Sequence, residues 1–196
     1  ENIMPLGANK AAIMGVAGVS TGDVVLLSSQ TISADATISF TSGITSTYGE
    51  YIFKFYNIHP ATNSTTFGFQ CSIDSGSNYN ISLTGTGIQT LHGEGDAVVG
   101  PSADHPDTGT GFFKLTDTTG NDNDQSAAGE LHLFNPSSTT YVKHFIASVT
   151  CSHANDHTSI YHTAGYFNTT DNIDAVRFQM SSGNLDTGTI KMWGVK

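Results

Sequence analysis

Residues 174–196, DAVRFQMSSGNLDTGTIKMWGVK, decide the fold class. Both VRFQM and TIKM alternate apolar with polar side chains, a period that is typical of half-buried β-strands. The Ser-Ser-Gly-Asn turn between them predicts a β-hairpin that completes the fold. Phe178 and Met180 are expected to face the core. Trp193, the chain's only tryptophan, is expected to pack against a neighbouring strand or subunit.

The same alternation recurs along the chain, for example in EYIFKFYNI and KHFIASVTC. About ten to twelve such runs, joined by short polar turns and without a convincing interior helix, predict an all-β fold. The expected architecture is an antiparallel β-sandwich that is jelly-roll-like. Residues 92–125 are rich in turn residues and acids, so only one short strand, FFKLTD, is expected there.

The first 22 residues differ from the rest of the chain in composition. They are mostly small and include no aromatic residue, and Ile3, Met4, Ile13 and Met14 offer too little apolar area to form a core. We therefore expect residues 1–22 to form an N-terminal arm that anchors the protein to a partner. Residues 23–196 are expected to form the β-sandwich domain.

The charge of the chain excludes two classes of partner. The formal net charge is −10, from 17 acidic and 7 basic residues. A nucleic acid or an anionic membrane requires a basic surface, which this composition does not supply. A membrane span requires about 18 or more consecutive apolar residues, and the sequence has no such run. We expect neither a nucleic-acid partner nor a membrane partner.

The two cysteines, Cys71 and Cys151, leave two alternatives open. A disulfide between them would close a long loop and stabilise the fold by a few kcal/mol. Each cysteine, however, lies in an alternating run of the kind that forms a strand. This placement favours two buried free thiols.

Two groups of residues resemble parts of metal sites. Asp122 and Asp124, in GNDNDQ, have the spacing of the first ligands in a calcium loop, but the later Gly and Glu of an EF-hand are missing. His153 and His157 have the spacing of zinc ligands on a helix, whereas this region is predicted to be strand and loop. We predict no metal and no cofactor.

Catalytic motifs are absent from the sequence. It contains no GxSxG, Walker or HExxH pattern. Glycoside hydrolysis needs a pair of carboxylates, for which Glu94, Asp96, Asp104 and Glu130 are the candidates. Because four Glu residues occur in the whole chain and two of them open strands, we predict that the protein is not an enzyme.

Three tyrosines are candidates for ligand binding. Tyr141, Tyr161 and Tyr166 could stack on the apolar faces of sugar rings if they are exposed. The alternative is that they pack in the core or against residues on neighbouring strands. The sequence leaves both roles open.

LHLFNPSSTTYVKHF (residues 131–145) and VRFQMSSGNLDTGTIKMWGVK (residues 176–196) resemble a family of small structural proteins of tailed bacteriophages, many of them marine. LLSSQTISADATISFTSG and YGEYIFKFYNIHPATN fit the same family, so the resemblance covers most of residues 5–196. Family endings often have Tyr at the position of Trp193. The resemblance implies a virion, tail-fibre or appendage protein, assembled in the host cytoplasm and exposed on the particle. It supplies no catalytic or ligand residues.

Three functions remain open. The first is a tail-fibre or receptor-binding module that contacts a glycan or protein of the host surface. The second is a capsid decoration protein, of the cement or head-fibre kind, and the third is a non-viral carbohydrate-binding module. Uncharged Ser- and Thr-rich faces can pack on copies of themselves, so we expect a homo-oligomer, a trimer, bound to other virion proteins through residues 1–22.

Overall fold

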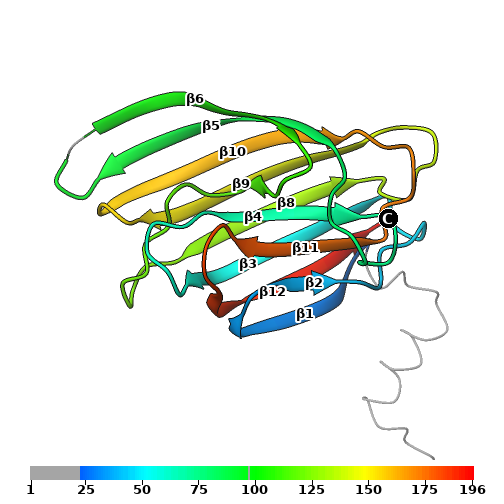
Figure 1. The fold of residues 1–196 in the computed structure, drawn as a ribbon, viewed down its shortest axis with the longest axis horizontal. Helices are drawn as coiled ribbons and strands as arrows, with labels where there is room; N and C mark the ends of the chain where they lie inside the picture. Colours follow the sequence, from blue (N-terminus) through cyan, green and yellow to red (C-terminus); the bar gives the residue numbers. More distant parts are fainter. Residues whose placement is uncertain (1–22, 97) are drawn as a thin grey trace, which may run out of the picture.

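The structure, a computed structural model, describes residues 23–96 and 98–196 (Figure 1). The expected arm, residues 1–22, lies outside the described residues. The described chain forms twelve β-strands, and every pair of neighbouring strands is antiparallel. No helix occurs among these residues.

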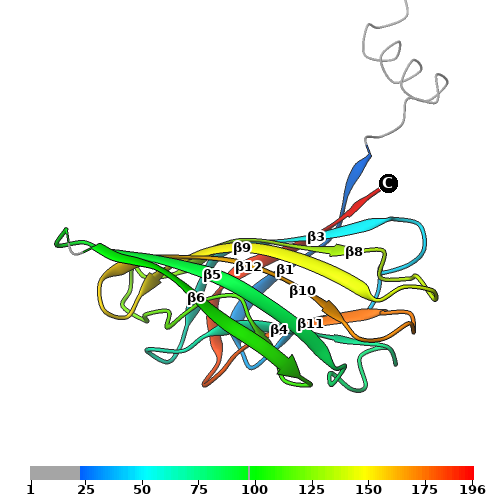
Figure 2. The same cartoon turned by 90° about the horizontal axis from the view of Figure 1, so that it is seen from above.

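The strands form two sheets. The large sheet has eight strands, which are in spatial order β1 (Val24–Asp35), β12 (Leu185–Val195), β3 (Glu50–Pro60), β8 (Ala127–Phe134), β9 (Lys143–His153), β10 (His157–Phe167), β5 (Leu83–Gly93) and β6 (Val98–Gly109). The small sheet has four strands, which are β2 (Ile38–Phe40), β11 (Ala175–Met180), β4 (Phe67–Ser72) and β7 (Phe113–Lys114). The two sheets lie face to face (Figure 2), so the predicted all-β antiparallel sandwich is confirmed.

The core lies between the sheets and is rich in phenylalanine. Phe178, on β11, is fully buried, and Met180 is 3% exposed, so their predicted inward orientation is confirmed. The ring centroids of five other phenylalanines lie 5.3–6.3 Å from that of Phe178: Phe40, Phe53, Phe55, Phe67 and Phe69. Edge-to-face and stacked pairs at these distances add to the stabilisation from apolar burial.

Residues 174–196 do not form the predicted hairpin. β11 pairs with β2 and β4 in the small sheet, whereas β12 pairs with β1 and β3 in the large sheet. Residues 181–184 therefore carry the chain from one sheet to the other. The hairpin prediction was wrong because two strands that face a shared core from opposite sides have the same alternation as two paired strands.

A second correction concerns residues 92–125, where one short strand was expected. β6 covers twelve of these residues, and the expected strand FFKLTD is reduced to β7. Pro101 and Pro106 lie within β6 and remove two hydrogen-bond donors from its ladder. An edge strand tolerates this loss, and β6 is an edge strand because it pairs with β5 alone.

Candidate functional site

The histidine expected as a metal candidate is held inside the fold. His153, at the end of β9, is 8% exposed, and its Nδ1 accepts a hydrogen bond from the backbone N–H of Asn155 (3.0 Å). Its ring proton is therefore on Nε2, which donates to Thr118 Oγ1 (2.6 Å) and lies 3.4 Å from Asp117 Oδ2. Gln89 Nε2 also donates to Asp117 Oδ2 (2.6 Å). Both ring nitrogens of His153 thus have partners within the chain.

Cys151 lies two residues before His153 on β9, so a thiol, an imidazole and a carboxylate occur in one region. Burial is the main cause that raises the pKa of Cys151 to about 11. The thiol therefore stays protonated at neutral pH, and a thiol is a poor nucleophile. Cys71 is also a buried free thiol, and burial raises its pKa as well. The cluster around His153 is suited to stabilising the sandwich rather than to catalysis.

The metal candidates do not assemble into a site. The rings of His153 and His157 lie 5.5 Å apart between centroids. Asp122 belongs to a turn in which its N–H donates to the side chain of Gln125 (3.1 Å), and Asp124 lines a polar cleft with Asp186. Among the residues that the structure describes, no group of three or more His, Cys, Asp or Glu side chains could hold a metal ion.

Acid is expected to weaken the fold through Asp117. Burial by itself would raise the pKa of this carboxyl, but hydrogen bonds from the Thr118 N–H and the Gln89 side chain lower it below its usual value. A carboxyl with a lowered folded pKa stabilises the fold above its unfolded pKa of about 4, and that contribution is lost as the pH falls through the folded pKa. Asp74 acts in the same direction, because hydrogen bonds lower its pKa to about 2.

We therefore expect the urea concentration at the unfolding midpoint of the wild-type protein to decrease as the pH is lowered from about 4 to about 2. Asp117→Asn should be less stable than wild type at pH 7 and should lose less stability on acidification. Urea unfolding at pH 7 and pH 3 measures both effects. An equal loss in the two proteins would contradict the role of Asp117.

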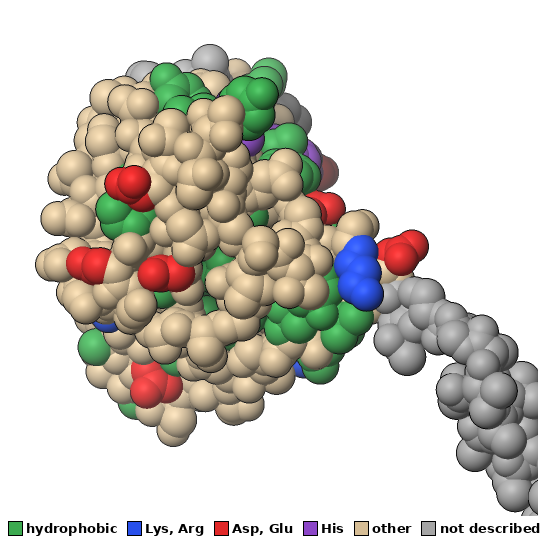
Figure 3. All heavy atoms as spheres, turned by 90° about the vertical axis from the view of Figure 1, so that its right-hand side faces the viewer, with side chains coloured by type: hydrophobic (Ala, Val, Ile, Leu, Met, Phe, Trp, Pro, Cys, Tyr) green, Lys and Arg blue, Asp and Glu red, His purple; other side chains and the backbone are tan. Residues whose placement is uncertain are grey.

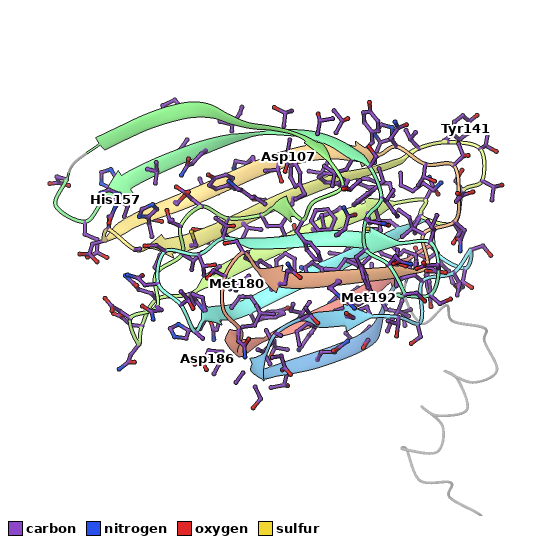
Figure 4. All side chains as sticks on the ribbon, in the orientation of Figure 1. Asp107, Tyr141, His157, Met180, Asp186 and Met192 are labelled. Atoms are coloured by element: carbon purple, nitrogen blue, oxygen red, sulfur yellow. The ribbon has the colours of Figure 1, made fainter. Side chains whose placement is uncertain are left out.

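The three candidate tyrosines lie in different environments. Tyr161 faces inward from β10 and is 1% exposed, so of the two roles that the sequence left open it takes the packing role. Tyr166 faces outward from the same strand and is half-buried, with its ring centroid 5.9 Å from that of His144. Tyr141 is 74% exposed in the loop before β9, at the opposite end of the sandwich from His157 (Figure 4). The buried Lys143 holds this loop by donating to the Tyr141 carbonyl (3.0 Å).

The candidate carboxylates for glycoside hydrolysis lie on separate elements. Glu94 and Asp96 lie in the turn after β5, and the side chain of Asp104 lies outside the described residues. Glu130 points outward from β8, where it contacts Lys54 (3.3 Å) and His132 (3.3 Å). Figure 3 shows acidic side chains scattered singly over one end of the molecule.

The outward face of the small sheet is covered by the chain itself. Gln70, on β4, is fully buried, and its Nε2 donates to the carbonyls of Ile81, Thr110 and Gly111 at 2.9–3.2 Å. The Arg177 guanidinium, on β11, lies 3.8 Å from the ring centroid of Tyr79. Two loops therefore lie over this sheet.

The outward face of the large sheet is more exposed. Five of its large apolar side chains are 43–55% exposed: Val24, Leu26, Tyr56, Ile88 and Ile146. The register of five neighbouring strands places one residue from each directly opposite the next, in the order Leu26, Trp193, Ile52, His132 and Ile146. We call these five residues the central row. Trp193 therefore lies on the outward face, opposite Leu26 on β1 and Ile52 on β3, and is not part of the core.

Four charged residues flank the central row, and their charges balance. Glu50 and Lys54 are on β3, Glu130 is on β8, and Lys191 is on β12, where its ammonium lies 5.3 Å from the ring centroid of Tyr56. His132 Nδ1 lies 2.5 Å from Glu50 Oε1, and hydrogen bonding from His132 is the main cause that lowers the pKa of Glu130. With histidine counted as neutral, the four charges sum to zero, in a chain whose formal net charge is −10.

A shallow hollow of about 540 Å³ adjoins the central row at Ile146. It lies on the same outward face, and Phe134, His144 and Tyr166 form much of its wall. Ala164, next to Ile146 on the neighbouring strand, leaves the space that a larger side chain would fill. The hollow and the central row together form the candidate functional site, a broad apolar surface suited to contact with another molecule.

No protein family, curated protein or solved structure matches the chain. Nothing in the described part of the chain forms a helix that is long and apolar enough to cross a membrane. Sequence reasoning missed Leu26, Ile52 and Ile146 as surface residues. The available signal was the unbroken apolar character of YIF and FIA, where outward positions that are normally polar carry isoleucine.

Proposed function

We propose that the chain is a structural protein of a bacteriophage virion, exposed on the particle as a tail-fibre, appendage or receptor-binding module. The sequence resemblance motivates the virion assignment. The observation that carries the mode of action is the broad, electrically balanced and partly apolar face of the large sheet, which suits binding rather than catalysis. Other virion proteins and further copies of the chain are the proposed partners.

The fold supports this proposal in a second way. The strand pairs are nested along the chain, because β1 pairs with β12, β2 with β11, β3 with β8 and β4 with β7. We describe this order as jelly-roll-like, since a ribbon of antiparallel strands that folds over on itself produces it. Closely paired strands suit a protein that is exposed outside a cell.

Host contact would involve the end of the sandwich that carries Tyr141 and Tyr166. Both side chains are accessible, and one of them lines the hollow. A host glycan or surface protein is the proposed ligand. Capsid decoration is the second candidate function, favoured by the breadth of the large sheet's outward face, which suits a protein partner.

Purified particles test the proposal directly. We expect mass spectrometry to detect the chain in them, and antibodies against it to label the particle surface in electron micrographs. For a receptor-binding module the free protein should block adsorption to host cells, and Tyr166→Ala with Tyr141→Ala should reduce the block at least about tenfold. Antibody labelling of the phage head, with no inhibition of adsorption by the free protein, would support the capsid decoration function. Absence from particles would overturn the virion assignment and favour the carbohydrate-binding module.

A further inference from the structure

We propose that two copies of this chain pair through the outward faces of their large sheets, around a two-fold axis that runs along the central row. This inference deepens the assembly part of the proposed function, and it replaces the trimer expected from the sequence. Under such an axis each residue of the row meets its own counterpart, so Trp193 packs near Trp193 and Ile52 near Ile52 of the second copy. Buried tryptophan at the centre of an interface is a common source of binding energy.

The size of the face fits a stable pair. Eight strands about 4.8 Å apart, with about ten residues each at about 3.4 Å per residue, span roughly 1,300 Å². Stable interfaces bury about 800 Å² on each partner. Contact over less than two thirds of the face is therefore sufficient.

The charges beside the row are complementary under this axis. Glu50 and Lys54 lie on β3, two residues on either side of Ile52, and thus at equal distances of about 6.7 Å from the row. Rotation about the row exchanges the two sides of each strand. Lys54 of one copy then faces Glu50 of the other, and the contact occurs twice. A face with this property is complementary to itself.

The twist of the sheet is compatible with the same axis. A regularly twisted sheet is a saddle, and a saddle maps onto itself under a two-fold axis that lies in the sheet and runs across the strands. Figure 2 shows the first residues of β1 and the last residues of β12 turning away from the small sheet, next to the bulge between Leu26 and Ser28. In the pair, this corner of one copy projects toward the second copy. It lies over a corner of the second copy that bends away from the interface.

Electrostatic repulsion between two copies is also expected to be weaker at this face than in other orientations. Two chains that each carry a formal charge of −10 repel one another in most orientations. The area around the central row carries two carboxylates and two ammonium groups, so contact there adds no net repulsion. The exposed apolar side chains of the row supply the attraction.

Charge reversal tests both the pair and its axis. Sedimentation or native mass spectrometry of purified protein should show a dimer. Lys54→Glu and Glu50→Lys, tested separately, each place like charges opposite one another in both contacts and should weaken self-association at least about tenfold. A mixture of the two variants should recover heterodimers within a few-fold of the wild-type affinity, because each carboxylate then faces an ammonium group. Other axes do not oppose these positions.

Apolar substitution gives a second test that does not depend on charge pairing. Ile146→Asp, in the row, should abolish the dimer, whereas Ile73→Asp, a similarly exposed residue in the loop after β4, should leave it intact. Circular dichroism should show that each variant is folded. If a charge-reversal variant does not fold, Lys54→Gln or Glu50→Gln is tested in its place. The proposed dimer would be overturned if the wild-type protein is a monomer at about 100 µM or forms a trimer. It would also be overturned if the mixed variants associate no more tightly than either variant alone. Absence of the chain from virions would not affect these measurements.

Discussion

Phe178→Ala is expected to lower the free energy of unfolding by about 3–5 kcal/mol. The side chain is fully buried, and five phenylalanine rings surround it within 6.3 Å between centroids. Removal of the ring leaves a cavity that spans the space between the sheets. Because both sheets are hydrogen-bonded ladders, neither collapses easily into that space. Urea unfolding at pH 7 measures the change.

Phe112→Ala is the matched control for Phe178→Ala. Phe112 precedes β7 and is only partly buried, so the same chemical change should cost less than about 1 kcal/mol. Similar losses in the two variants would contradict the central place of Phe178 in the core.

The alternation of side chains predicted which residues of each strand face the core. The inward orientation of Phe178 and Met180 follows from this period of two. Alternation does not indicate which strands are neighbours. The β11–β12 hairpin was wrong for this reason, since the two strands bury their apolar sides on one core from different sheets.

For the candidate tyrosines, the alternation of side chains along a strand predicts relative orientation but not burial. Tyr161 and Tyr166 are five positions apart in the sequence. Because this spacing is odd, a regular strand directs their side chains to opposite faces. Only one of the two could therefore join an outward surface, and this much was available from the sequence. The depth of burial of Tyr161 was not, because it depends on the opposite sheet.

The candidate site was beyond sequence reasoning for a different reason. The central row joins residues from five strands, and it exists only through their register. A shift of one residue in any strand would turn that strand's member of the row toward the core. The positions of Glu50 and Lys54 on either side of Ile52 could be read from β3 alone, but their meaning depends on the row.

Gly129→Ala is expected to destabilise the fold by about 3–5 kcal/mol, because overpacking and a strained backbone act together. Gly129 lies on β8 at φ +156°, where β8 is paired with β3 on one side and β9 on the other. A Cβ there would overlap the carbonyl oxygen of Ser148 and lie 2.7 Å from Val149 Cα, so a backbone in the middle of the sheet would have to move. Gly111→Ala is the matched control, since a Cβ at Gly111 meets nothing within 4 Å. Thermal and urea unfolding should show a large loss for the first variant and a change within about 0.5 kcal/mol for the second. A Gly129→Ala protein as stable as the control would mean that β8 and β9 separate readily, which contradicts a rigid large sheet.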